Sequence, residues 1–178
     1  MKTALLVIDV QQALVDERPA RMDEFLLNIG MLIDAAHQGE TEVIYVRHDC
    51  GAGDSLAFGS IGWQLERSIT PRAEERIFDK RFRSAFFKTG LQKYLQEREI
   101  TRLIICGMQT EYCIDTSVKT AFERGFTVVV PAGATSTYAN PFLSGEKLIS
   151  YYEHMIWHEP LAKVVSVEQA QKLLNPAN

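Results

Sequence analysis

Cys113 is the residue of this chain whose position most favours chemistry. A run of β-forming residues ends at Gly107, a short polar loop follows, and a helical pattern begins near Tyr112. The thiol therefore falls in the first turn of a predicted helix, where unpaired backbone N–H groups and the helix dipole favour a thiolate. The position suits a nucleophilic cysteine, although a small buried thiol would also fit it.

A thiol nucleophile needs a base that takes its proton and a cation that stabilises the thiolate. Asp9 follows the apolar run Ala4–Ile8 directly, and Lys80 follows the short run Arg76–Asp79. Both residues therefore stand at the carboxyl ends of predicted strands. Attack on a carbonyl also needs donors for the oxyanion, and we expect these from the backbone N–H groups of Cys113 and of the Met108–Gln109 turn.

Short apolar runs alternate with longer amphipathic segments along the whole chain. The predicted strands are Ala4–Ile8, Glu42–Arg47, Arg76–Asp79, Arg102–Cys106, Phe126–Val130 and Ala162–Val165. The predicted helices are Asp23–His37, Thr89–Glu99, Tyr112–Arg124, Gly145–Met155 and Val167–Leu174, the last capped by Ser166. Residues 49–75 are rich in glycine and irregular, which is typical of a functional loop.

This alternation predicts an α/β fold, a three-layer αβα sandwich around a Rossmann-like, mostly parallel sheet of about six strands in the order 3-2-1-4-5-6. Ligands bind such sheets at the carboxyl ends of the strands, where the strand order reverses. In the predicted order that crevice lies between strands one and four. We therefore expect Asp9 and Cys113 to face each other across it.

The composition excludes several classes of protein. The 178 residues predict a single domain, 1–178, with 46% hydrophobic and 24% charged residues, as in an ordinary globular protein. The net charge of −4 argues against binding to nucleic acid or to an anionic membrane. No apolar run approaches the roughly 20 residues that span a bilayer. Three cysteines without a CxxC spacing predict reduced thiols and a cytoplasmic location.

Three separated sequence blocks resemble the isochorismatase-like cysteine hydrolases, a family that includes nicotinamidases and N-carbamoyl amide hydrolases. The first block is Ala4–Gln11, with a strand followed by Asp-x-Gln. The second begins at Asp79-Lys80 and continues through Ser84-Ala85-Phe86. The third is Gly107–Cys113. The resemblance runs from residue 3 to about 138, and the order of the three blocks makes it specific.

The resemblance implies a catalytic triad of Asp9 as base, Lys80 as partner of the thiolate and carboxylate, and Cys113 as nucleophile. It implies a cis peptide bond between Met108 and Gln109 that directs the Gln109 N–H into the oxyanion hole. It also implies a small-molecule substrate and no cofactor. We expect a homo-oligomer, a dimer or tetramer, partly from the resemblance and partly because the aromatic-rich segments 138–142 and 151–157 are candidate contact surfaces. Candidates for contacting the substrate are Gln11, His48, Trp63, Phe82, Tyr112 and Tyr138, with core packing as the alternative for the aromatic residues.

The chain departs from the nicotinamidases of this family, which hold a metal between an Asp and two His after strand two. Here only His48 and Asp49 occupy that region, so we expect no metal. We therefore predict a cysteine-dependent hydrolase of a small amide or related carbonyl with a carbon–nitrogen bond, acting through a thioester. The alternatives are a metal-assisted, nicotinamidase-like enzyme and a non-catalytic thiol sensor in which Cys113 pairs with Cys50.

Overall fold

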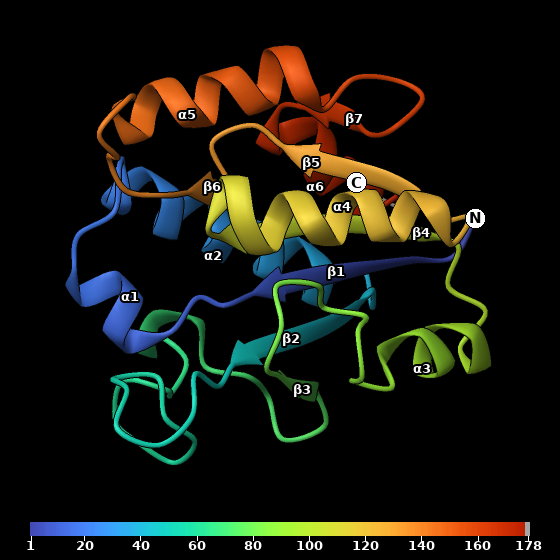
Figure 1. The fold of residues 1–178 in the computed structure, drawn as a ribbon. Helices are drawn as coiled ribbons and strands as arrows, with labels where there is room; N and C mark the ends of the chain where they lie inside the picture. Colours follow the sequence, from blue (N-terminus) through green and yellow to red (C-terminus); the bar gives the residue numbers. More distant parts are fainter. Residues whose placement is uncertain (177–178) are drawn as a thin grey trace.

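A parallel sheet of seven strands forms the centre of the molecule (Figure 1). The computed structural model describes residues 1–176. Its strand order is β3-β2-β1-β4-β5-β7, with β6 paired to β4. The strands are β1 (Thr3–Ile8), β2 (Glu42–His48), β3 (Arg76–Lys80), β4 (Arg102–Met108), β5 (Thr127–Pro131), β6 (Thr135–Ser136) and β7 (Lys163–Val165). The predicted order is confirmed, because β7 is the sixth predicted strand; the two-residue β6 is too short to produce a periodic pattern.

Helices cover both faces of the sheet, as the αβα prediction requires (Figure 1). Helices α2 and α6 pack together on one face, and α3 and α4 pack on the other. The helices are α1 (Gln12–Asp16), α2 (Met22–Gln38), α3 (Leu91–Glu97), α4 (Asp115–Glu123), α5 (Gly145–Tyr151) and α6 (Val167–Leu174). Shorter helical turns are η1 (Arg67–Ile69), η2 (Thr110–Ile114) and η3 (Tyr152–Ile156).

The hydrophobic core consists of two clusters of buried side chains, one on each face of the sheet. Along β1, Leu5 and Val7 pack under α2 and α6, whereas Leu6 and Ile8 pack under α3 and α4. This alternation explains why the strand is a continuous apolar run from Ala4 onward: both of its faces are buried. Ser166 caps α6 through a capping box with Gln169, which confirms the predicted cap.

Two predicted helices begin or end in wider π-helical turns. The predicted helix Tyr112–Arg124 divides into the π turn η2 and the α-helix α4, and the predicted helix Gly145–Met155 divides into α5 and the π turn η3. A five-residue π turn keeps nearly the same hydrophobic spacing as an α-helix, so periodicity does not reveal it. Such turns are frequent at functional sites, and η2 contains Cys113.

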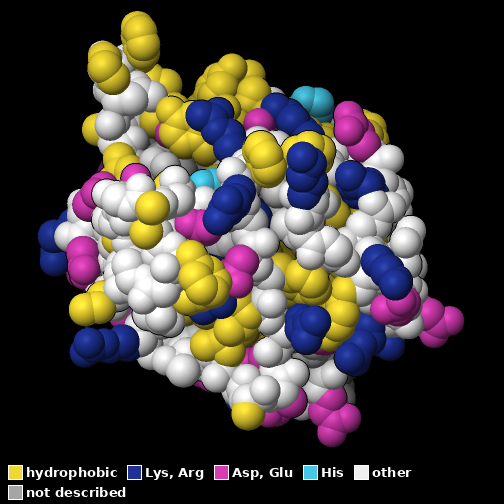
Figure 2. Space-filling model, turned by 60° about the horizontal axis from the view of Figure 1, so that its bottom comes forward, with side chains coloured by type: hydrophobic (Ala, Val, Ile, Leu, Met, Phe, Trp, Pro, Cys, Tyr) yellow, Lys and Arg dark blue, Asp and Glu magenta, His cyan; other side chains and the backbone are white. Residues whose placement is uncertain are grey.

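No helix of the described residues is long and apolar enough to cross a membrane. On the face shown in Figure 2, Lys and Arg side chains are interspersed with Asp, Glu and hydrophobic side chains. That face therefore has no extended patch of a single charge.

Candidate active site

The ammonium group of Lys80 connects the other two residues of the proposed triad, Asp9 and Cys113. Its Nζ lies 2.6 Å from Asp9 Oδ2 and 3.3 Å from Cys113 Sγ. It also lies 2.8 Å from Nδ1 of His48. The Lys80 side chain is fully buried, so a charge at this depth depends on the carboxylate of Asp9 as its counter-ion. His48 is its neighbour because β2 and β3 align these two residues in register.

Asp9 occupies a sharp turn of the backbone at the end of β1. Its φ angle of 54° lies in the left-handed region, which an Asp adopts at a modest cost in free energy. Its N–H donates to the carbonyl of Val46 at 2.9 Å, which holds the turn against β2. Oδ2 pairs with Lys80, while Oδ1 is buried and has no donor among the described residues. This free oxygen is suited to accept a proton.

Gly107 allows β1 and β4 to approach closely beside the site. The residue pairs with Ile8 in the sheet register and has a φ angle of 125°. A Cβ at this position would collide with the carbonyl oxygen of Ile8. Glycine is therefore required on steric and conformational grounds. The peptide bond that follows Met108, between Met108 and Gln109, is cis.

The surroundings of Cys113 favour the protonated thiol. Burial and, to a smaller extent, the negative charge of Asp9 raise the pKa of this thiol to about 12, against the opposing effect of the Lys80 ammonium. This differs from the thiolate expected for the first turn of a helix. The reason is that Cys113 lies inside the π turn η2, largely out of water, before α4 begins at Asp115. Desolvation of the charged form outweighs the cation beside it.

His48 is neutral and contributes a hydrogen-bond donor. Burial and the nearby Lys80 ammonium both lower the pKa of the imidazole. Because an ammonium only donates, Nδ1 of His48 accepts the hydrogen bond from Lys80, which places the imidazole proton on Nε2. His48 also lines the cavity in front of Cys113.

Gln11 holds the backbone around the site in place. Its side-chain amide donates to the carbonyl oxygens of His48 at 3.0 Å and Trp63 at 2.9 Å, and its Oε1 accepts from the His48 N–H at 2.8 Å. All of these partners are backbone groups, so this buried side chain joins the end of β2 to the long loop. The structure thus places Gln11 behind the cavity, among the groups that shape it.

A cavity of about 350 Å³ lies in front of the triad. Its lining residues are Asp9, Leu14, His48, Cys50, Leu56, Arg83, Gln109, Tyr112 and Cys113. Of the substrate candidates that the sequence suggested, His48 and Tyr112 therefore line it. Leu56 and Arg83, which also line it, had no separate signal in the sequence, because the segments that carry them have no distinctive periodic pattern.

The remaining aromatic candidates lie outside this lining, each for an identifiable reason. Trp63 is buried, and Cζ of Arg47 lies 3.5 Å from the centre of the Trp63 ring. Phe82 packs edge-on against Phe87 beside a neighbouring depression. Tyr138 donates its hydroxyl hydrogen to the carbonyl of Leu14, so it supports the cavity wall from behind.

A metal ion does not fit the donor groups of this site. In the described part of the chain, one group of donors could hold a metal: Asp9, His48 and Cys113, whose ligand atoms lie within 4.8 Å of one another. The Lys80 ammonium contacts all three of these side chains. A metal cation would have to occupy the same space and would meet an adjacent positive charge. Asp49 is also engaged, because it accepts hydrogen bonds from Gly51, Phe58 and Arg81.

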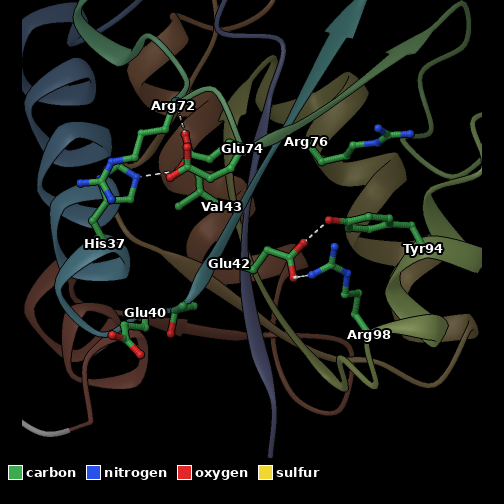
Figure 3. Close-up of a pocket in the computed structure, with 11 residues that line it drawn as sticks. His37, Glu40, Glu42, Val43, Arg72, Glu74, Arg76, Tyr94 and Arg98 are labelled. Carbon is green, nitrogen blue, oxygen red and sulfur yellow. Dashed lines mark hydrogen bonds and ion pairs between the residues drawn. The ribbon is translucent and has the colours of Figure 1, made fainter.

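A larger cavity of about 460 Å³ lies at the opposite end of the sheet, where β2 and β3 begin (Figure 3). Some of its charged groups are paired with one another. His37 contacts Glu75 at 2.6 Å, and Glu42 accepts a hydrogen bond from Tyr94 and lies 3.8 Å from Arg98. The described residues that line it include no cysteine or lysine, so it offers no nucleophile comparable to that at the carboxyl ends of the strands.

Comparison with known proteins identifies the family. Residues 3–145 match the isochorismatase domain model. The chain belongs to the isochorismatase family. Within it, the chain is 30% identical to the crystal structure of an isochorismatase family protein, with a TM-score of 0.85 over 92% of this chain and 98% of the other. The matched range includes all three sequence blocks that carry Asp9, Lys80 and Cys113.

Relatives of this isochorismatase-family chain include proteins named as hydrolases. Streptothricin hydrolase from Streptomyces noursei is 33% identical over 144 residues, which cover 80% of this chain and 57% of that protein. Ureidoacrylate amidohydrolase RutB from Cronobacter turicensis is 28% identical over 125 residues, which cover 70% of this chain and 51% of that protein. The chain thus spans about half the length of these curated relatives.

Proposed function

We propose that this protein is a cysteine-dependent hydrolase of a small amide or related carbonyl compound with a carbon–nitrogen bond other than a peptide bond. The observation that carries the proposal is the contact of one buried ammonium, Lys80 Nζ, with both Asp9 and Cys113. The free Oδ1 of Asp9 supplies the base that a protonated thiol requires. The names of the hydrolase relatives agree with this reaction class.

The first half of the reaction forms a thioester. Asp9 takes the proton of Cys113 as its sulfur attacks the substrate carbonyl carbon, and a carbon–sulfur bond forms. The backbone N–H groups of Gln109 and Cys113 donate to the resulting oxyanion. Asp9 then returns the proton to the leaving nitrogen, the carbon–nitrogen bond breaks, and ammonia or an amine departs. A primary amide releases ammonia.

The second half restores the thiol. Asp9 takes a proton from a water molecule, whose oxygen attacks the thioester carbonyl. The carbon–sulfur bond breaks, the carboxylic acid product leaves, and the sulfur recovers its proton from Asp9. Lys80 keeps its ammonium throughout and stabilises whichever neighbour, carboxylate or thiolate, carries the negative charge. Because Asp9 serves as base and acid in turn, the two half-reactions need no further titrating group.

Turnover of a panel of small amides tests the proposal, with released ammonia or amine as the readout. We expect Cys113→Ala to lower kcat/KM by at least about a thousandfold, because the nucleophile is lost. Cys106→Ala is the matched control, since Cys106 is buried inside β4 and is not part of the site. It should keep kcat/KM within a few fold. Full turnover by Cys113→Ala would refute the mechanism.

A further inference from the structure

Arg83 places a guanidinium at the mouth of the catalytic cavity. The residue lies in the loop that follows β3, three positions after Lys80, and it lines the cavity together with Cys113. Its Cζ lies 4.1 Å from the centre of the Tyr112 ring, and Tyr112 directly precedes Cys113. At this distance the guanidinium lies over the aromatic ring in a cation–π contact, which uses none of its N–H groups as hydrogen-bond donors to a charged partner and leaves them available to a ligand.

The charge of Arg83 has no counter-ion among the described residues. No carboxylate in this part of the chain lies within ion-pair distance of Arg83, whereas neighbouring arginines are paired. Arg47 pairs with Asp79 at 2.9 Å, and Arg81 pairs with Asp49 at 3.0 Å. Because Lys80 and Asp9 offset each other, Arg83 gives the cavity its uncompensated positive charge.

The rest of the cavity wall is suited to a small organic body attached to an anionic group. Leu14, Leu56 and the Tyr112 ring supply apolar surface, and among the described residues no lysine or other arginine lines the cavity besides Arg83. A guanidinium edge matches the two oxygens of a carboxylate, with which it forms a pair of parallel hydrogen bonds. The apolar wall and the single cation thus divide the cavity into two functional parts.

We propose that Arg83 binds a carboxylate of the substrate, so that the protein acts on small amides that also carry a carboxylate group. The inference rests on the proposed function, because it assigns one end of the substrate to Cys113 and the other to Arg83. Arg83 is then a specificity residue: it should affect the capture of substrate more than the chemical step.

Covalent labelling of Cys113 by matched reagents tests the proposal without a known substrate. N-chloroacetylglycine and N-chloroacetyl-β-alanine carry a carboxylate at two different distances from the reactive carbon. Their primary amides are the neutral counterparts. In each case the sulfur displaces chloride, and the labelled peptide is counted by mass spectrometry. The ratio of the acid rate to the amide rate cancels the pKa of the thiol, because both reagents are attacked by the same sulfur.

We expect Arg83→Gln to lower this rate ratio by about fivefold to tenfold for at least one of the two lengths, and Arg83→Lys to restore part of it. Arg81→Gln is the matched control. It removes a positive charge only two residues from Arg83, but the Arg81 side chain is already paired with Asp49. It should change the ratio by less than about twofold. A ratio that Arg83→Gln leaves unchanged, or that Arg81→Gln lowers equally, would overturn the proposal.

A second measurement does not depend on the thiol. In the Cys113→Ala variant, NMR titration should show tighter binding of N-acetylglycine than of N-acetylglycinamide, and Arg83→Gln should abolish the difference. Equal binding of the two ligands would refute the carboxylate site. If N-acetylglycine binds more tightly than N-acetylglycinamide but no amide is turned over, the hydrolase proposal fails and the carboxylate site stands. If amides are turned over but the two ligands bind equally, the carboxylate site fails and the hydrolase proposal stands.

Discussion

At the scale of single residues, the Lys80 ammonium occupies a position that could otherwise hold a metal cation. It contacts a carboxylate, an imidazole nitrogen and a sulfur, which are all common zinc ligands. The ammonium neutralises Asp9 and occupies the space that an ion would need. The sequence led us to expect no metal because the region after strand two contains only one histidine, His48. The contacts of Lys80 give a separate physical argument for that expectation.

Removal of the ammonium should therefore create a metal site. We expect Lys80→Ala to bind Zn²⁺ through Asp9, His48 and Cys113, whose ligand atoms are already close together. Isothermal titration with zinc should detect binding to this variant and none at the wild-type site. The double variant Lys80→Ala/His48→Ala serves as the control, because it lacks one ligand. Equal zinc affinity in the single and double variants would contradict the prediction.

The two charges beside Cys113 act on its pKa in opposite directions. Asp9 raises the pKa of the thiol and Lys80 lowers it. At a pH below the pKa, lowering the pKa by one increases the thiolate fraction about tenfold. At pH 8.5 we therefore expect Asp9→Asn to alkylate with iodoacetamide faster than wild type, by about threefold or more, and Lys80→Met to alkylate more slowly.

The Asp9→Asn result separates two roles of the carboxylate. The variant should lose turnover while it gains reactivity towards iodoacetamide, because the base is lost but the thiolate becomes easier to form. If Asp9→Asn lowered the alkylation rate instead, the carboxylate would be needed to generate the thiolate in the resting site. The pH dependence of labelling at Cys106 should stay unchanged and provides an internal reference.

At the scale of elements, the sequence predicted the strands and their order better than the start of the helix that carries Cys113. Strands such as β1 are continuous apolar runs followed by a polar residue, a signal that needs no tertiary information. The π turn η2 gives no such signal, because five residues do not distinguish its spacing from that of an α-helix. The raised pKa of the Cys113 thiol differs from the thiolate that the first turn of a helix favours, because burial within the turn, which sequence does not report, disfavours the charged form.

The same limit applies to the cavity. Its catalytic end comes from residues next to strand ends, which the topology predicts. Its outer wall comes from loops, and there sequence patterns indicated neither the Arg83–Tyr112 stack nor the supporting role of Gln11. The long-range hydrogen bonds of Gln11 join positions that are 37 and 52 residues apart, and no local rule predicts such pairs.

The contact of β1 with β4 should be very sensitive to one added methyl group. We expect Gly107→Ala to lower the free energy of unfolding by about 3–5 kcal/mol, because its Cβ meets the Ile8 carbonyl and its φ angle is positive. Gly30 lies in α2, and a Cβ added there would meet open space. We therefore expect Gly30→Ala to raise the free energy of unfolding by about 0.5–1 kcal/mol. Urea unfolding measures both, and equal effects would contradict the steric explanation.

At the scale of the whole molecule, two exposed apolar side chains are candidates for contacts between subunits. Phe142 is 90% exposed and Met155 is 61% exposed, and they lie in the aromatic-rich segments 138–142 and 151–157. Exposed apolar surface of this kind can mark a site that another chain covers. We therefore expect a homo-oligomer, a dimer or a tetramer.

Sedimentation equilibrium tests this expectation against a chain mass of 20.1 kDa. Wild-type protein should show two or four times that mass, and the double variant Phe142→Asp/Met155→Asp should shift towards the monomer. A variant with Leu27→Asp, which is exposed on α2 away from those segments, is the control and should keep the wild-type mass. A monomeric wild type would refute the expectation.

The burial of Cys113 has a consequence for its reaction with oxidants. Burial raises the pKa of the thiol, so the buried sulfur forms less thiolate at neutral pH than an exposed cysteine does. Peroxide reacts with the thiolate, and we therefore expect the resting sulfur to be converted only slowly to sulfenic and sulfinic acid. A redox sensor needs the opposite property. The burial that would make a nucleophilic Cys113 dependent on Asp9 would thus also protect its sulfur.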